Sequence, residues 1–311
     1  RERERESMSS SSAGYLEVLS DGSVKRLAPE ISTTEDGDAF RCRDVVIHPD
    51  PSKPVSARVF VPSAIPAARL PVLLYFHGGG FCIGSTTWSG YHSFLGRLCV
   101  RALCIVVSVD YRLAPEHRLP AAYDDCYSSV EWLAGAGDDV DVVQAADLSR
   151  VFLSGESAGG NIAHHVMVGV LRQPVGGVRI RGVLLIHPFF GSEARNEAES
   201  NDAGVALSDM FWRLSLPEGA DRDHPYCHLH KGEPVEGEWW GRFPRVCVFV
   251  AGRDLLRERG TAYGSLLSGK GVEVTVVVAE QEPHAHHVLY PHSQGAHLLQ
   301  SQMAHFIHQA P

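Results

Sequence analysis

The residues best suited to chemistry in this sequence form the pentapeptide G-E-S-A-G at positions 155–159. The apolar run 151–153 before it is typical of a strand, and a helical pattern follows it. A serine in a G-x-S-x-G sequence between a strand and a helix occupies a sharp turn that exposes its hydroxyl. Gly155 and Gly159 suit such a turn because it is strained and tightly packed. The pattern predicts that Ser157 is a nucleophile.

A second motif, H-G-G-G at 77–80, follows the strand-like run 72–76. Acyl transfer needs backbone N–H donors that already face the oxygen on which negative charge develops. Glycines let the main chain approach a substrate closely, so we expect an oxyanion hole made by the N–H groups of Gly79, Gly80 and Ala158. The alternative, a plain flexible turn, is disfavoured by the strand before the motif and by the serine turn later in the chain.

A serine nucleophile needs a base, and the base needs a carboxylate that orients it. Around a turn of this kind the acid comes later in the chain and the histidine last. The apolar run 246–251 predicts a late strand, and Asp254 lies in the loop that leaves it. We therefore predict Asp254 as the acid, and we expect the acids of the polar stretch 191–241 to be solvated.

Three histidines compete for the role of base, because 284, 286 and 287 all follow the last strand-like run at 272–278. Pro283 imposes extended geometry on the residue before it and favours a turn immediately before His284. His286 and His287 lie at the start of an apolar stretch. We favour His284 as the base, with His286 as the main rival.

The elements that must position these residues alternate along most of the chain. The alternation predicts a mostly parallel sheet with helices on both faces, an α/β fold. We expect one domain over 15–311, with cap elements at about 15–40 and 191–241, and an extension or disordered segment over 1–14. The expected strands are 15–19 and 23–27 (a hairpin), 43–47, 55–61, 72–76, 104–109, 151–153, 180–186, 245–250 and 272–278, and the expected helices are 94–101, 121–133, 161–171, 257–267 and 293–308.

Composition narrows the classes of partner. The 311 residues carry a formal net charge of −9, which disfavours nucleic acid and anionic membrane surfaces. No apolar run approaches the roughly 20 residues of a membrane span. The expected partner is a small-molecule ester, with no nucleic acid and no membrane, and the protein is expected to be a monomer or a homodimer.

The cysteines and the N-terminal residues indicate a cellular compartment. The seven cysteines are odd in number and contain no C-x-x-C pair, which favours a reducing compartment. The start of the chain is charged and then serine-rich, without the apolar core of a signal peptide. We expect a cytoplasmic protein, with the nucleus as a second location. Met8 is a candidate initiator, which would make residues 1–7 an extension.

Neither a metal nor another cofactor is expected. The histidine-rich tract 284–292 lacks the H-E-x-x-H type of ligand spacing and a matching carboxylate or cysteine. The glycines at 78–80 lack the Lys-Ser/Thr of a phosphate-binding loop. Charged residues near the motifs, Asp110, Arg112 and Glu116, are expected to form an ion-pair network that braces the oxyanion loop, and Glu156 is expected to make structural hydrogen bonds.

These motifs together resemble the hormone-sensitive-lipase-type α/β-hydrolases, and within them the plant carboxylesterases. The resemblance runs from about residue 15 to the end, and residues 81–85 with Trp88 are most similar to the branch that includes strigolactone-hydrolysing members. It implies an eight-stranded sheet, a cap, and hydrolysis of small to medium apolar esters through an acyl-enzyme on Ser157. A plant hormone ester, strigolactone-like, or a secondary-metabolite ester is the implied substrate. The motifs that carry the resemblance are 77–81, 110–116, 119–122, 155–165 and 252–256.

The resemblance leaves a departure and two alternatives. The family often carries Gly-Phe after its catalytic histidine, whereas Ala285-His286 follows here and makes the lip of the pocket more polar. Gibberellin receptors resemble this fold but replace the histidine and usually the third glycine, and this chain keeps His284 and Gly80. Dehydratases and cyclases of specialised metabolism are the other alternative. The residues predicted to line the substrate pocket are Phe81, Leu255, Trp88 and His286.

Overall fold

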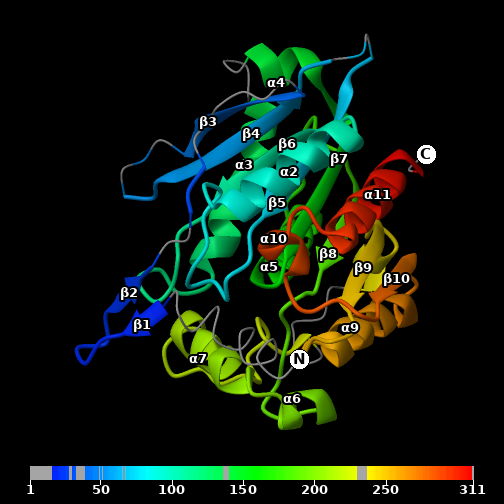
Figure 1. The fold of residues 1–311 in the computed structure, drawn as a ribbon. Helices are drawn as coiled ribbons and strands as arrows, with labels where there is room; N and C mark the ends of the chain where they lie inside the picture. Colours follow the sequence, from blue (N-terminus) through cyan, green and yellow to red (C-terminus); the bar gives the residue numbers. More distant parts are fainter. Residues whose placement is uncertain are drawn as a thin grey trace.

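The computed structural model shows a sheet between two layers of helices (Figure 1). It describes residues 16–27, 30–32, 39–48, 50, 52–64, 66, 68–135, 140–229 and 237–309. The predicted extension over 1–14 lies outside these residues, as do parts of the two predicted cap elements.

The strands of the sheet lie where the sequence predicted them. Their bounds are β3 Phe40–His48, β4 Val55–Pro62, β5 Leu70–Phe76, β6 Ile105–Asp110, β7 Ala146–Glu156, β8 Ile180–Ile186, β9 Arg245–Ala251 and β10 Val274–Ala279. Within the described residues these eight strands form one sheet in the order β10-β9-β8-β7-β5-β6-β4-β3. Neighbours from β10 to β6 pair in parallel, and β4 pairs antiparallel with β6 and with β3. The predicted mostly parallel sheet is confirmed.

The helices include the five that the sequence predicted and several shorter ones. Their bounds are α2 Ser89–Arg101, α3 Ala121–Gly135, α4 Val140–Ala145, α5 Ala158–Arg172, α6 Glu197–Asn201, α7 Val205–Ser215, α8 Gly237–Trp240, α9 Arg257–Gly269, α10 His286–Leu289 and α11 Gln294–Gln309. None of the helices in the described part of the chain combines the length and apolar character that crossing a lipid bilayer requires.

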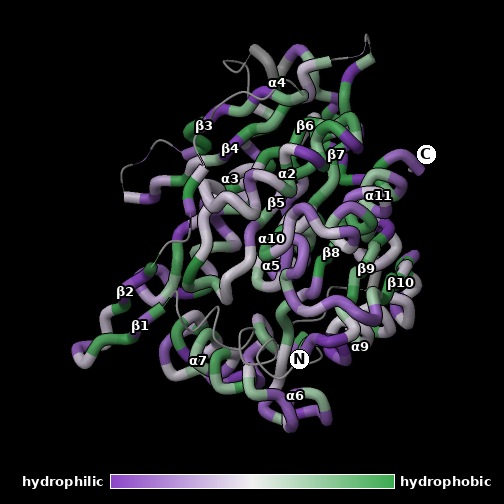
Figure 2. Tube along the Cα trace, in the orientation of Figure 1, coloured by the Kyte–Doolittle hydropathy of each residue, from purple (hydrophilic) through white to green (hydrophobic). Residues whose placement is uncertain are grey.

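Two apolar layers, one on each face of the sheet, hold it in place. In β5 the side chains of Val72, Leu74 and Phe76 pack in one layer with α3, α5 and α9. Leu73 and Tyr75 face the other layer with α2 and α11. A strand buried on both faces reads as a continuous apolar run, which is why the sequence revealed the central strands so clearly. Figure 2 shows the hydrophobic segments gathered in these strands.

The hairpin near the N-terminus is also confirmed. Strands β1 (Leu16–Val18) and β2 (Val24–Arg26) pair antiparallel. Arg26 at the end of β2 forms an ion pair with Glu116 (2.6 Å) and donates to the carbonyl oxygens of Cys82 and Ala114. The hairpin is therefore attached to the segment that follows the glycine motif.

The polar excursion between β8 and β9 packs partly against the glycine motif. The ring of Trp212 in α7 stacks on Phe189 at 4.4 Å between centroids and lies 5.5 Å from the ring of Phe81. Figure 1 shows α6 and α7 at the end of the sheet where β7 leads into α5. Side chains of α7 therefore lie beside the loops that carry the predicted chemistry.

Candidate active site

Ser157 is the one residue between β7 and α5, and its backbone is strained. Its φ is +54° and its ψ −115°, a conformation that residues with a side chain rarely adopt. Its N–H donates to the carbonyl of Ile186 (2.8 Å), and its carbonyl accepts from the N–H of Phe189 (2.9 Å). A Cβ on Gly159 would lie 1.9 Å from the carbonyl oxygen of Phe76, so only glycine fits where the turn crosses β5. Neighbouring elements thus hold the serine in the sharp turn that the sequence predicted.

The glycine motif leaves backbone donors free beside this turn. Gly79 and Gly80 have φ values of +106° and +59°, and a Cβ on Gly80 would lie 2.2 Å from the ring of Phe211. Among the hydrogen bonds of the described residues, none uses the N–H of Gly79, Gly80 or Ala158 as donor. These groups are available to an external acceptor.

Asp254 and His284 meet at the same edge of the sheet. Asp254 follows β9 and is 7% exposed, and its Oδ1 accepts from the N–H of Leu256 (2.9 Å). Its Oδ2 lies 2.6 Å from Nδ1 of His284, in the loop after β10. The structure pairs the acid with the favoured histidine. No hydrogen bond joins Asp254 to the rival His286 among the described residues.

A second carboxylate, that of Glu156, also faces His284. Glu156 Oε1 lies 3.4 Å from Nε2 of His284, and its Oε2 accepts from the hydroxyl of Tyr91 (2.7 Å). The same Tyr91 hydroxyl accepts from the N–H of Gly78 (2.9 Å). Glu156 therefore makes the structural hydrogen bond expected of it and also contacts His284. Among the described residues no hydrogen bond joins the hydroxyl of Ser157 to His284.

The two carboxylates determine the charge of His284. Burial lowers the pKa of the imidazole, but the charges and hydrogen bonds of Asp254 and Glu156 outweigh burial and raise the pKa to about 10. An opposite charge within a few ångströms favours the charged form of a group. The site is therefore built to stabilise an imidazolium at His284.

Comparison with known proteins agrees with this geometry. The sequence profile of a family described as alpha/beta hydrolase fold matches residues 73–288. The chain belongs to the α/β-hydrolase family. In Arabidopsis thaliana the protein named probable carboxylesterase 6 is 39% identical, over 93% of this chain and 87% of its own length. Tuliposide A-converting enzyme 2, chloroplastic, of Tulipa gesneriana is 38% identical over 89% of this chain and 70% of its own.

Solved structures agree as well. An esterase of the archaeon Pyrobaculum calidifontis superposes with a TM-score of 0.74 at 30% identity, over 86% of this chain and 84% of that one. This α/β-hydrolase therefore groups with the plant carboxylesterases, as its motifs indicated, and its esterase fold is shared with an archaeal enzyme.

Of the four residues predicted to line the substrate pocket of this α/β-hydrolase, His286 lines a cavity of the described residues. Phe81 is 1% exposed and packs within the aromatic cluster of α7. Trp88 is half-buried with its ring 6.3 Å from that of Tyr91, and Leu255 is half-buried. His286 is 3% exposed and lines a cavity between β9, β10 and α11 that includes none of the other three. Contact of these residues with substrate stays a prediction.

The charged residues predicted to form one network make separate contacts. Arg112 forms an ion pair with Asp125 (2.6 Å), whereas Glu116 pairs with Arg26. Asp110 accepts from the N–H of Thr86 (3.2 Å). These contacts fit the expected structural roles. The prediction of a single network was wrong, because among the described residues no ion pair joins Asp110, Arg112 and Glu116 to one another.

Sequence reasoning missed two residues of the site. Tyr91 in α2 connects the glycine motif with Glu156, and His187, which follows β8, lies beside His284 with ring centroids 5.6 Å apart. Neither has a local motif that marks it. Both come from elements that only the folded sheet brings to this edge.

Proposed function

We propose that this carboxylesterase relative hydrolyses carboxylic esters through an acyl-enzyme, with Ser157 as nucleophile, His284 as base and Asp254 as the residue that orients the base. The 2.6 Å hydrogen bond between His284 and Asp254, at the sheet edge where Ser157 is held in a strained turn, carries the proposal. Nucleophile, base and orienting acid in this order along the chain fit the serine hydrolase pattern.

The chemical steps follow from the positions of these groups. Ser157 Oγ bonds to the ester carbonyl carbon while His284 Nε2 takes the hydroxyl proton, and the carbonyl electron pair moves onto its oxygen. The N–H groups of Gly79, Gly80 and Ala158 donate to that oxyanion. The oxyanion collapses, the alcohol leaves with the proton from His284, and the acyl group stays on Ser157. Water then repeats the sequence and releases the acid.

The base must reach the serine for the first step. Nε2 of His284 faces Glu156 in the structure, at 3.4 Å. Catalytic hydrogen bonds of free enzymes are often long and tighten only in the substrate complex. We expect substrate binding to turn Nε2 from Glu156 toward Ser157, with Nδ1 kept on Asp254. Because an imidazolium cannot accept the serine proton, the proton on Nε2 must pass to solvent as the contact with Glu156 is lost.

The proposed substrate is a small or medium ester with an apolar acyl group, of the plant hormone or secondary-metabolite class. The rings of Phe81, Phe189 and Trp212 form an apolar cluster beside the glycine motif, and most ligand sites are apolar with few polar groups. Relatives named for conversion of tuliposide A, at 35–38% identity, support the secondary-metabolite class over a strigolactone-like hormone.

A receptor without hydrolytic activity is the less favoured alternative. The serine that gibberellin receptors usually carry at the third glycine does not fit here, because a Cβ on Gly80 would meet the ring of Phe211 at 2.2 Å. A dehydratase or cyclase, the other alternative, would carry out elimination rather than acyl transfer at this site.

Burst kinetics with a short p-nitrophenyl ester test the proposal. We expect one equivalent of p-nitrophenol in a fast phase, followed by steady turnover, with both phases lost in Ser157→Ala and in His284→Ala. Folded wild-type protein that releases no p-nitrophenol would contradict esterase activity. Loss of water from a hydroxylated substrate, by wild type that releases no p-nitrophenol, would favour the dehydratase alternative.

A further inference from the structure

Three histidines outside the proposed triad gather beside it. His187 follows β8, and His286 and His287 begin α10. Their ring centroids lie 5.3–5.8 Å apart, and one nitrogen of each lies within 4.8 Å of the other two. All three are buried, with exposed fractions of 3%, 3% and 0%. The cluster joins a strand end to a helix that lies about a hundred residues later in the sequence.

Three ring nitrogens of this cluster lack protein partners among the described residues. Within the described residues, Nε2 of His286 and both ring nitrogens of His287 are buried without a hydrogen bond. Buried polar groups in folded proteins are nearly always satisfied by protein, water or an ion. Nδ1 of His286 lies 3.3 Å from the carbonyl oxygen of Pro283, a contact in which Nδ1 is the donor. That is how a backbone carbonyl orients a metal-binding histidine.

We propose that His187, His286 and His287 bind a divalent transition metal of the zinc class. Neutral imidazoles suit zinc, copper and nickel, and three histidines are a known zinc ligand set. Tetrahedral zinc with nitrogen ligands places those nitrogens about 3.3 Å apart. The three nitrogens are already within 4.8 Å, so small side-chain rotations close the site.

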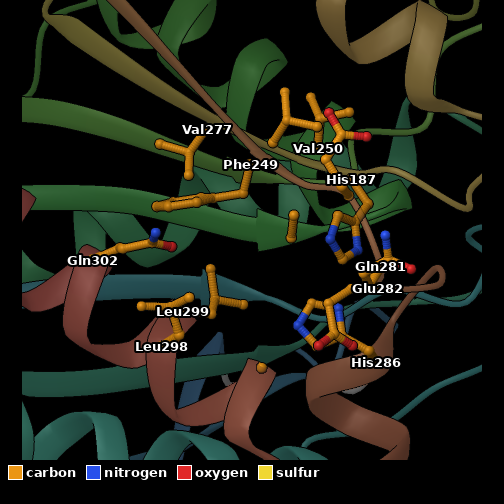
Figure 3. A pocket seen from close by; sticks show the side chains of 14 residues that line it. His187, Phe249, Val250, Val277, Gln281, Glu282, His286, Leu298, Leu299 and Gln302 are labelled. Atoms are coloured by element: carbon orange, nitrogen blue, oxygen red, sulfur yellow. The ribbon is translucent and has the colours of Figure 1, made fainter.

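A cavity leads to the cluster. Its volume is about 240 Å³, and His187 and His286 line it together with Phe249, Glu282 and Leu299. Figure 3 shows the rings of His187 and His286 facing the same space. A metal can enter here, and a water from the cavity fills the fourth position, as in zinc sites with three protein ligands.

Binding at this site engages the loop of the catalytic base. Nδ1 of His187 accepts from the N–H of Ala285, the residue after His284, at 3.2 Å. When Nε2 of His187 binds a metal, Nδ1 carries the proton and this contact with Ala285 is given up. The site therefore couples metal binding to the position of residues 284 and 285. The inference holds whether or not Ser157 is the nucleophile.

Equilibrium dialysis of the full chain against zinc chloride, with bound metal measured by mass spectrometry, tests the site. We expect one zinc per chain at micromolar free zinc. His287→Gln and His286→Phe should each lower the affinity by about 10-fold or more, because each removes one of three ligands. His292→Gln is the matched control, an exposed histidine of the same tract, and should bind zinc as the wild type does.

Two further readouts separate this site from surface binding. Cobalt(II) in the wild type should show visible bands of a tetrahedral nitrogen and oxygen site, without the sulfur charge-transfer band that a buried cysteine would give. Zinc should raise the melting midpoint of the wild type by a few degrees through mass action, and of His292→Gln equally, but not of His286→Phe. No zinc in the wild type, which would mean that water satisfies these nitrogens, overturns the proposal. Equal zinc in the cluster variants, or a loss only in His292→Gln, overturns it too.

Discussion

Two groups of histidines lie side by side at one edge of the sheet and differ in their neighbours. His284 is paired with Asp254 and Glu156, which raise its pKa to about 10. Among the described residues no ion pair joins a carboxylate to His187, His286 or His287, and their pKa values are lowered mainly by burial. The residue type is the same in both groups. The carboxylates that end β7 and follow β9 suit His284 to proton transfer, whereas three ring nitrogens of His286 and His287 are buried without a hydrogen bond among the described residues.

Among the variants that test this difference, removal of the His284 imidazole should lower kcat the most. We expect His284→Asn to lower kcat for a p-nitrophenyl ester by roughly 10⁵–10⁶-fold, because loss of the base removes nearly all triad catalysis. His292→Asn, on the exposed part of the same tract, should retain wild-type kcat. Retention of more than a hundredth of the activity by His284→Asn would show that another histidine is the base.

Asp254→Asn should have the next largest effect. The amide still reaches Nδ1 of His284 but no longer stabilises its positive charge, so we expect kcat to fall by about 10⁴-fold. Steady-state kinetics with the same ester provide the measurement, and circular dichroism checks the fold. A fall of less than tenfold would mean that Glu156 alone positions and charges the base.

Gly80→Ser tests the predicted oxyanion loop at 77–80, which would act together with His284. The new Cβ meets the ring of Phe211, and the φ of +59° disfavours serine, so the loop must shift. Loss of one oxyanion donor predicts a fall in kcat of about 10²–10³-fold. Gly176→Ser is the matched control, since a Cβ there meets nothing within 4 Å. Unchanged kcat in Gly80→Ser would remove this loop from the account.

Glu156→Gln should have the smallest effect of these variants, a shift in the pH dependence of kcat/KM, and it tests whether a carboxylate makes His284 different from the other three histidines. The titratable groups that act on His284 among the described residues are the carboxylates of Asp254 and Glu156 and the histidines at 187, 286 and 287. Removal of the negative charge of Glu156 destabilises the imidazolium, so the pKa of His284 falls and the neutral base is available at lower pH. The acid limb of the kcat/KM profile should therefore move down by about one pH unit.

Tyr91→Phe is the control for this shift, because it removes the hydroxyl that donates to Glu156 and keeps the charge. Its acid limb should move by less than that of Glu156→Gln. A limb that stays in place or moves upward in Glu156→Gln would show that this carboxylate does not charge the base.

Much of the fold and of the proposed triad was visible in the sequence because the signals are local. The central strands are apolar runs bounded by turns, and the Ser157 turn, Asp254 and His284 each follow such a run directly. Element boundaries were less visible. Gly90 obscures the start of α2 in the sequence, because glycine is a poor helix former. Only glycine fits there, since a Cβ would lie 2.2 Å from the carbonyl oxygen of Val288. The first residues of β7 are largely polar, so the sequence did not reveal where that strand begins.

The rest depended on contacts between distant elements. Nothing near His187 in the sequence places it against His286 and His287. Tyr91 reaches Glu156 across 65 positions. The short helix α10 has four residues, too few for a helical period to show.

Labelling with a reactive alkyl phosphonate ester tests the central claim most directly, because it reports an activated serine without knowledge of the natural substrate. Intact-mass measurement of the wild type should show one phosphonyl group per chain, peptide mapping should place it on Ser157, and His284→Asn should react far more slowly. A folded wild type that takes up no phosphonate, or takes it up at another residue, would contradict the account.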